Sequence, residues 1–230
     1  MIETSLVDWD GKLTTVLFFD KCNFMCPFCQ NWELLLHPER FPPIDWSQIK
    51  KTLLPKKSWI DGVVLTGGEP LVYETEIFDI CRKITNLEFL VKIDTNGAYP
   101  GTLQELIGKD LVDYVAMDIK APLDDRYDQA AGTKVDLQAI KRSVQILKDA
   151  KIDYEFRTTC VPGIINEQTI AEIGEQIKEA KRWFLQQYVP VNAYKKEYRD
   201  LHAIPSPITN KLLRIAEKFA AEVKWRGKEI

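Results

Sequence analysis

Short apolar runs alternate along the chain with longer segments in which apolar residues recur every three or four positions. The short runs are rich in β-branched and aromatic residues and predict strands, at residues 4–8, 13–20, 62–66, 89–94, 114–119, 154–161 and 183–189. The longer segments predict helices, at residues 46–54, 74–84, 103–107, 137–150, 168–180 and 209–223. Such alternation is typical of parallel strands joined by right-handed crossovers, so the pattern predicts an α/β fold.

Two regions depart from this alternation. The first two strands are expected to form an antiparallel hairpin, because Asp10-Gly11 between them tolerates the positive φ angles of a tight turn. The stretch 192–207 is the least regular, and Pro205 and Pro207 bar regular structure just before the last helix. We expect this stretch to be a long surface loop able to cover an opening in the fold.

Composition narrows the class of protein further. At 230 residues the chain is long enough for one sizeable α/β domain. The net charge of −3, with acidic and basic residues mixed along the chain, argues against a nucleic-acid or membrane partner. Neither an N-terminal signal pattern nor an apolar run of membrane-spanning length is visible. Five cysteines, three of them crowded together, favour metal ligation in a reducing cytoplasm over a disulfide framework.

Three cysteines directly follow the second predicted strand. Cys22, Cys26 and Cys29 have the spacing C-x3-C-x2-C, so their thiolates can converge on one soft metal centre and leave one coordination position open. A structural zinc site with His37 as the fourth ligand is the alternative. The spacing alone does not choose between an iron–sulfur cluster and zinc.

Polar motifs follow the later strands as well. Gly67-Gly-Glu-Pro70 follows the third predicted strand, Asp94-Thr-Asn-Gly97 the fourth and Asp118-Ile-Lys120 the fifth, while Arg157 lies on the sixth. Because the carboxyl ends of parallel strands share one rim, these groups are expected to lie near the cysteine loop. Glycines let backbone approach a ligand closely, and Glu69 offers an anionic acceptor. A structural zinc site needs no such array, so the rim favours the cluster.

Together these motifs resemble the radical S-adenosylmethionine (SAM) enzymes, and among them the small activases of glycyl radical enzymes. The resemblance covers most of the chain and rests chiefly on the cysteine triad and on Thr66-Gly-Gly-Glu-Pro70. It implies that the three cysteines bind three irons of a 4Fe-4S cluster, whose fourth iron is chelated by the amino and carboxylate groups of SAM. It also implies a single domain, residues 1–230, folded as a partial (β/α)6 barrel with a short N-terminal hairpin. The loop and helix of residues 192–230 would then pack on or cover the barrel opening.

The resemblance further implies a SAM site, made of Phe28, Gly67, Gly68, Glu69, Asp94, Asn96, Lys120, Arg157 and Asn192. In that site Glu69 would lie near the methionine ammonium, Lys120 would pair with the carboxylate, and Arg157 would help to hold the cofactor. Asp94 would face the ribose or a bound monovalent cation. The companion ligands of that cation would be Thr95, Asp118 and the carbonyl of Ala116. Where those activases carry a histidine after the sixth barrel strand, this chain has Asn192.

The expected activity is reductive cleavage of SAM to a 5′-deoxyadenosyl radical, which abstracts hydrogen from a backbone glycine. Chain length and motifs resemble most the activating proteins of anaerobic ribonucleoside-triphosphate reductase, which makes the large reductase subunit the expected partner and a flavodoxin or ferredoxin-type protein the electron donor. Residues 194–199 are a candidate contact surface for the partner. The alternatives are a radical SAM enzyme acting on a small molecule or nucleotide and a zinc-stabilised interaction module. Cys81 and Cys160 are expected to be buried apolar residues.

Overall fold

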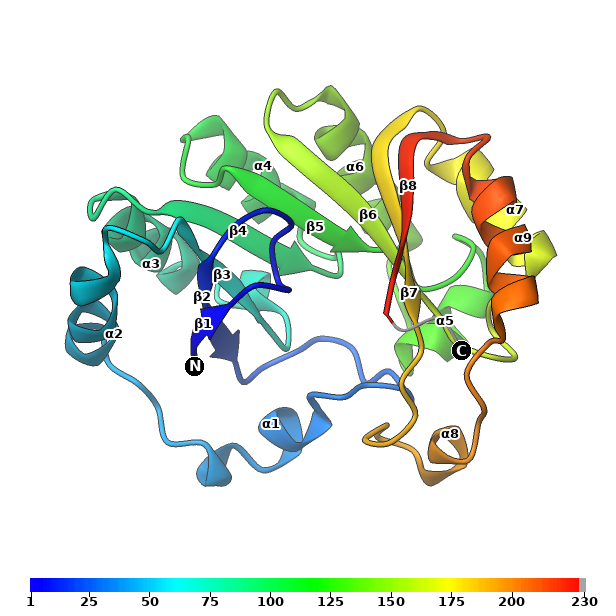
Figure 1. Cartoon of the computed structure of the whole chain (residues 1–230), viewed down its shortest axis with the longest axis horizontal. Coiled ribbons are helices and arrows are strands. Elements are labelled where there is room, and N and C mark those ends of the chain that lie inside the picture. The colour runs from blue at the N-terminus through cyan, green and yellow to red at the C-terminus, as the bar shows by residue number, and fades with distance from the viewer. Residues whose placement is uncertain (228–230) are drawn as a thin grey trace.

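A computed structural model describes residues 1–227, whose strands form one continuous sheet (Figure 1). The strands are β1 (Ile2–Ser5), β2 (Thr14–Phe19), β3 (Gly62–Gly67), β4 (Leu90–Thr95), β5 (Tyr114–Asp118), β6 (Asp153–Cys160), β7 (Ala180–Gln187) and β8 (Ala220–Arg226). They lie side by side in chain order; β1 pairs antiparallel with β2, and every later pair is parallel. The predicted α/β class and N-terminal hairpin are confirmed.

Helices connect the parallel strands. They are α1 (Trp32–Leu36), α2 (Trp46–Leu53), α3 (Glu76–Thr85), α4 (Pro100–Gly108), α5 (Arg126–Ala131), α6 (Leu137–Asp149), α7 (Glu167–Gln176), α8 (Lys196–Arg199) and α9 (Ser206–Ala216), with short 3-10 turns at Pro38–Arg40, Leu54–Lys56 and Pro70–Val72. Caps fix several of the starts: the Asp45 carboxylate accepts the backbone N–H of Gln48 ahead of α2, and Asn166 accepts that of Thr169 ahead of α7. In the described part of the chain, no helix is both long and apolar enough to cross a membrane.

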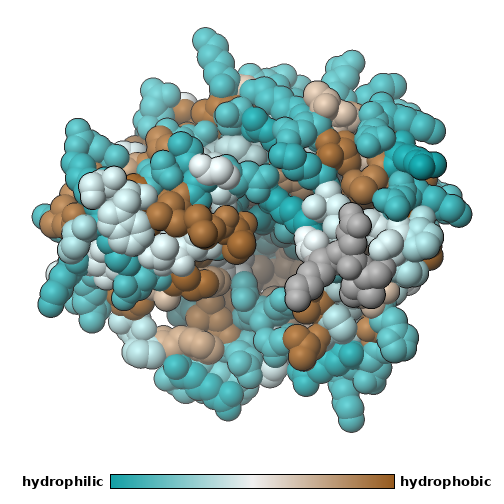
Figure 2. Space-filling view, in the orientation of Figure 1, coloured by the Kyte–Doolittle hydropathy of each residue, from teal (hydrophilic) through white to brown (hydrophobic). Residues whose placement is uncertain are grey.

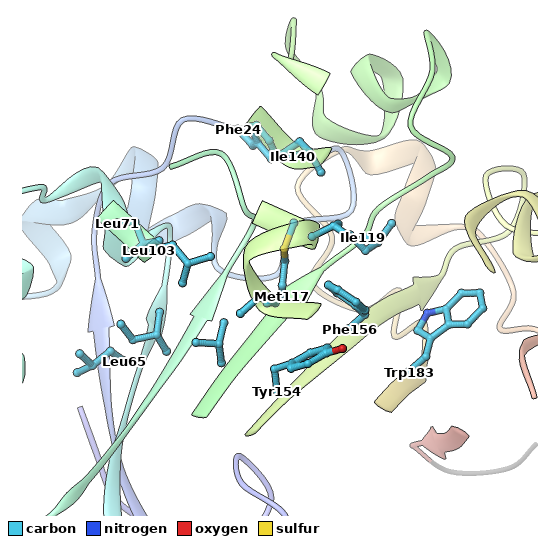
Figure 3. Packing of buried hydrophobic residues seen from close by; sticks show 14 of the residues in the cluster. Phe24, Leu65, Leu71, Leu103, Met117, Ile119, Ile140, Tyr154, Phe156 and Trp183 are labelled. Atoms are coloured by element: carbon cyan, nitrogen blue, oxygen red, sulfur yellow. The ribbon is translucent and has the colours of Figure 1, made fainter. Parts of the chain in front are cut away.

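The curved sheet has an apolar outer face and an inner face that is apolar at Val16 and Val64 and carries charged residues on β4 to β6. Leu65, Met117 and Phe156 project from the outer face of their strands into a core completed by residues of the covering helices, such as Leu103 and Ile140 (Figure 3). Burial of this core between the sheet and its helices supplies the main hydrophobic stabilisation of the fold. On β4, β5 and β6 the alternate positions carry charged groups, and Asp94, Asp118 and Arg157 among them face a cavity described below. Period-two alternation therefore divides these three strands between an apolar face and a face that carries the charged groups.

The N-terminal hairpin closes the end of the barrel opposite the strand carboxyl ends. Trp9, next to the Asp10-Gly11 turn, packs with its ring 5.5 Å from that of Tyr114, and Lys92 on the inner face donates a hydrogen bond to the Asp8 carbonyl. The first strand is shorter than predicted and ends at Ser5, not Asp8. The Ser5 hydroxyl bonds Asp8 and the Val7 N–H, and these local bonds take the place of strand pairing.

The prediction of one helix over 209–223 is wrong in its second half. Helix α9 ends at Ala216, and the chain then runs as β8 with Val223 opposite Trp183 of β7. The ring of Phe219 packs on Gly174 of α7, where a Cβ atom would lie 2.2 Å from it. The spacing of the apolar residues 219 and 223 fits a helix as well as it fits a strand. Pairing with β7 is what makes this segment a strand. The expected loop and helix of 192–230 thus ends in an eighth strand, and residues 228–230 lie outside the described residues.

Candidate functional site

A cavity of about 440 Å³ opens at the carboxyl ends of β3 to β7, and Figure 2 shows the hollow in the middle of that face of the molecule. It brings together most of the residues that the sequence singled out. The predicted residues that line it are Cys22, Cys26, Phe28, Cys29, Gly67, Gly68, Asp94, Thr95, Asn96, Asp118, Lys120 and Arg157. These residues come from the cysteine loop and from four different strands, β3 to β6, and the parallel arrangement of the strands brings them together in one site.

The cysteine loop presents three thiols to this cavity in a largely dry setting. Cys26 is buried, and Phe24 and Phe28 are buried beside it. Burial raises the pKa of the Cys22 and Cys26 thiols to about 11 and raises that of Cys29, while the positive charge of Lys120 acts in the opposite direction on all three. No three His, Cys, Asp or Glu side chains within residues 1–227 are arranged around one metal ion. A cluster of four irons takes each thiolate on a different iron, so the three need not meet at one point.

Backbone contacts with glycines hold the loop in place. The Met25 N–H donates to the Ala131 carbonyl at the end of α5 (2.9 Å), and a Cβ on the following Gly132 would lie 2.0 Å from the Met25 oxygen. A Cβ on Gly68 would lie 2.1 Å from the Lys21 oxygen, and the Glu69 N–H donates to that same carbonyl at 2.7 Å. The glycines of the Gly-Gly-Glu-Pro turn thus allow the turn to pack against the cysteine loop as well as to border the cavity.

Glu69 is buried beneath the rim and holds the next motif. Its Oε1 accepts hydrogen bonds from the Leu71 N–H (3.1 Å) and the Thr95 hydroxyl (2.8 Å), and its Oε2 accepts one from the Asn96 N–H (2.6 Å). Burial raises the pKa of Glu69 to about 7, although these three donors favour the ionised form. The Asn96 amide in turn donates to Asn23 of the cysteine loop (2.8 Å). Glu69 therefore joins two strand-end motifs to the loop.

Two carboxylates and three cationic side chains form a network of ion pairs across the inner face. Arg157 bridges Asp94 (Nη1 to Oδ2, 3.1 Å) and Asp118 (Nε to Oδ1, 2.9 Å), and Lys120 lies 3.3 Å from the other oxygen of Asp118. Lys92 lies 3.1 Å from the other oxygen of Asp94. Burial alone would raise the pKa of both aspartates, but the neighbouring cations hold it below its usual value. Both carboxylates are therefore ionised at neutral pH.

Glu69 lies beneath the cavity lining, and three further sequence predictions lie outside it. Asn192 does not line it; its amide donates to the Gln30 carbonyl (3.0 Å), and the Trp32 indole donates to its own carbonyl (3.2 Å). The surface expected at residues 194–199 packs here as well, with Tyr194 and Arg199 against Trp32. This segment, which follows β7, therefore packs against the residues of the cysteine loop and those directly after it. His37 lies on an exposed loop next to Glu39, away from the cavity lining.

Sequence reasoning missed several residues of the site. Thr66 donates from its hydroxyl to Asp94 (3.1 Å), and Thr159 and Gln186 line the cavity from β6 and β7. Lys92 could have been found, because it lies two residues before Asp94 on the same strand face. Gly132 gives no such signal, since its partner Met25 is far away in the sequence.

A parallel barrel with three cysteines at the carboxyl ends of its strands, beside a polar cavity, is the arrangement of an enzyme that uses an iron–sulfur cluster with a second ligand. The comparisons identify which class. The family model of the radical SAM superfamily matches residues 16–177, most of the chain. The chain belongs to the radical SAM superfamily, and the predicted family is confirmed.

Individual relatives agree with this assignment. A protein of Methanocaldococcus jannaschii provisionally named a glycyl-radical enzyme activating enzyme is 31% identical over 233 residues, covering 98% of this chain and 94% of the relative. The pyruvate formate-lyase-activating enzyme of Clostridium pasteurianum is 26% identical over 236 residues, covering 95% of this chain and 94% of that enzyme. Among solved structures, Streptococcus suis SuiB has a TM-score of 0.71 at 16% identity over 93% of this chain. The chain spans about half of that structure (49%).

Membership of the superfamily implies a 4Fe-4S cluster and SAM, and the residues fit both. Three thiols from one short loop face the cavity, and the buried aromatic side chains of Phe24 and Phe28 line it beside them. Lys120, which lines the same cavity, supplies a positive charge toward the thiols. The zinc alternative finds no support, because His37 is not brought to the cysteines.

Proposed function

We propose that this radical SAM enzyme is an activase that abstracts hydrogen from a backbone glycine of a glycyl radical enzyme, with anaerobic ribonucleoside-triphosphate reductase as its partner. The activase part of the proposal is supported by two relatives named as activating enzymes of glycyl radical enzymes, each matched over nearly its whole length. The choice of the reductase as partner rests on the resemblance of chain length and motifs described above. A flavodoxin or ferredoxin-type donor and a cytoplasmic location belong to the same proposal.

In this proposal the cluster and SAM, when bound, supply a one-electron reductive cleavage to methionine and a 5′-deoxyadenosyl radical. The protein binds and orients them. Cys22, Cys26 and Cys29 hold three irons. Lys120 would be the cation for the methionine carboxylate, and Glu69, held by three hydrogen bonds, would be the anionic group that attracts the methionine ammonium.

The remaining residues keep the site rigid and dry. Arg157 cross-links Asp94 and Asp118, so the groups that face the nucleoside are fixed before it binds. Phe24 and Phe28 exclude water from the cysteine side of the cavity, which limits side reactions of a radical. No side-chain acid or base is needed, because the reaction transfers a hydrogen atom.

The test uses the full chain, reconstituted anaerobically with iron and sulfide, mixed with each glycyl radical enzyme of the same genome, dithionite and SAM. Electron paramagnetic resonance should show a glycyl radical that requires SAM and is lost with Cys26→Ala. A silent spectrum with every partner, together with turnover of a small metabolite, would favour a small-molecule radical SAM enzyme. Absence of 5′-deoxyadenosine from a fully reconstituted protein would count against SAM cleavage itself.

A further inference from the structure

The inner face of β4 to β6 offers poor ligands for the monovalent cation expected at Asp94, Thr95 and Asp118. Asp94 Oδ2 faces the Arg157 guanidinium and the Thr66 hydroxyl, each at 3.1 Å, and Asp94 Oδ1 faces Lys92 at 3.1 Å. Both oxygens of Asp118 face cationic groups as well. A free cation would have to displace donors from Asp118 and from Asp94 Oδ2, whereas Asp94 Oδ1 accepts no hydrogen bond within the described residues and has the Lys92 ammonium 3.1 Å away.

The third expected ligand is engaged elsewhere. The Thr95 hydroxyl donates to Glu69 Oε1 at 2.8 Å and accepts the N–H of Gly97 at 3.1 Å. Glu69 belongs to the turn after β3, and Gly97 belongs to the same motif as Thr95. Thr95 is itself buried, so its side chain has little freedom to turn toward Asp94.

The charge balance gives the same answer. Asp94 and Asp118 have three cationic partners, Lys92, Lys120 and Arg157, while the buried Glu155 carboxylate also interacts with Arg157. A further cation would meet repulsion from three neighbours in a buried, poorly screened setting.

Lys92 has the features of a built-in cation. Its side chain is 1% exposed, and its ammonium contacts one Asp94 oxygen and donates to the backbone carbonyl of Asp8. A carboxylate oxygen and a backbone carbonyl are the hard oxygen ligands that a sodium or potassium ion prefers. The ring of Tyr114, 5.8 Å away, adds a cation–π contact. Asp8 and Asp94 both line the cavity, whereas Lys92 lies behind them.

We propose that the ammonium of Lys92 takes the place of a bound monovalent cation at Asp94, so that this enzyme binds SAM without sodium or potassium. Lys92 is then a positioning residue: it acts on the cofactor through Asp94 and fixes that carboxylate to the hairpin that closes the barrel. The inference concerns SAM binding alone and is independent of which molecule the enzyme acts on.

The test compares wild type with Lys92→Ala, each reconstituted with its cluster, in choline chloride and in potassium chloride of equal ionic strength. Wild-type SAM affinity, measured by isothermal titration calorimetry, should agree within about twofold between the salts. The variant should bind about tenfold more weakly in choline chloride and recover saturably with potassium or methylammonium, which can enter the space left by the side chain. An affinity of the wild type that rises tenfold or more with potassium would overturn the proposal.

A second measurement separates cation replacement from simple packing. In the cluster-free proteins, potassium and thallium(I) should raise the thermal midpoint of Lys92→Ala and leave that of wild type unchanged. A variant that is weakened but recovers with none of these cations would show that Lys92 is structural only. If the variant does not fold, the salt dependence of wild-type SAM binding still decides.

Lys56→Ala is the matched control. Lys56 likewise contacts a carboxylate and a backbone carbonyl, both of Glu3 in β1, at 2.8 and 3.2 Å, but it lies outside the SAM cavity. Its variant should bind SAM like wild type in both salts. Salt-dependent SAM binding in Lys56→Ala would mean that loosening the hairpin, not losing the cation at Asp94, causes the effect.

Discussion

Burial and hydrogen bonding have opposite effects on the pKa of Glu69. It is fully buried, which favours the neutral acid, yet three hydrogen-bond donors converge on its carboxylate. The resulting pKa of about 7 places the charge change of Glu69 near neutral pH. The ionised form is the one that can attract the ammonium of SAM.

The SAM affinity of the reconstituted protein should therefore depend on pH. As pH falls below about 7, Glu69 gains a proton and binding should weaken by up to about tenfold per pH unit. Glu69→Gln should bind weakly and lack this dependence, whereas Glu105→Gln on the exposed side of α4 should behave as wild type. Calorimetric titrations between pH 6 and 8 check this, and a flat wild-type profile would contradict it.

The same shift has the opposite sign for stability without SAM. Because the pKa of Glu69 is raised from 4.5 to about 7 in the folded state, the fold binds this proton more tightly than the unfolded chain. The contribution of Glu69 to stability is thus present below about pH 4.5 and is lost as pH rises to about 7.

The cysteines divide into ligands and core residues. Replacing Cys22, Cys26 or Cys29 by alanine should abolish cluster binding and SAM cleavage. Cys81→Ala and Cys160→Ala should retain both, since these side chains are fully buried outside the cavity lining, at a stability cost of about 1 kcal/mol. Absorbance near 400 nm and a 5′-deoxyadenosine assay distinguish the sets. Loss of the cluster from either core variant would show that the ligand set is misassigned.

At the scale of elements, the site depends on how loops pack against one another. Helix α5 ends at Ala131, and Gly132 then adopts a φ of +69°, which lets the chain pass directly over Met25. From the other side, the segment after β7 packs against the loop. The Asn192 side chain and carbonyl bond Gln30 and Trp32, and the Lys195 N–H donates to the Pro27 carbonyl (2.9 Å). The three-cysteine loop is therefore held between two elements.

Gly132→Ala should displace the cysteine loop and lower cluster occupancy severalfold while the fold is retained, because its Cβ would lie 2.0 Å from the Met25 oxygen. Gly163→Ala is the control, since Gly163 has a φ of +84° but nothing within 4 Å of an added Cβ. Both carry the same backbone strain of about 1 kcal/mol. Iron content and circular dichroism measure the two effects, and equal iron content in both variants would contradict the packing role.

The strand-end motifs were predictable from sequence because each is local to the strand that precedes it. Asp94 to Gly97, for example, is recognisable as a strand end from its own polar residues and the apolar run directly before it. The position of Lys92 on the same strand face as Asp94 could be predicted in the same way, but its contact with Asp8 could not, because Asp8 is 84 positions away. Strand β8 was missed for the same reason: residues 220–226 become a strand only beside β7. Asn192 is assigned to the SAM site by the resemblance alone; in the structure its amide donates a hydrogen bond to the Gln30 carbonyl.

At the scale of the whole molecule, the charged inner face links the last strand to the first hairpin. Arg226 of β8 pairs with both oxygens of Glu155 on β6, at 2.5 and 3.0 Å, and reaches Asp10 of the hairpin at 3.2 Å. Glu155 is 1% exposed, and its remaining partner is the Tyr114 hydroxyl (2.6 Å). These contacts join distant parts of the chain below the cavity.

Arg226→Met should lower the free energy of unfolding by about 3 kcal/mol, because it leaves the buried charge of Glu155 without its cation. Lys224→Met is the control. Lys224 is half exposed and pairs with Glu222 at the surface, so its loss should cost less than about 1 kcal/mol. Urea denaturation of the cluster-free proteins compares them. Indistinguishable midpoints for the two variants would mean that the inner ion pair contributes no more than a surface one.

Transfer of deuterium tests the central proposal most directly, because it follows the atom that the activase is proposed to remove. The partner glycyl radical enzyme is produced with α-deuterated glycine and mixed with the reconstituted protein, SAM and dithionite. Mass spectrometry should find one deuterium in the 5′-deoxyadenosine, and none when the partner is omitted. A product that carries no deuterium, formed in the same amount with or without the partner, would contradict hydrogen abstraction from a protein glycine.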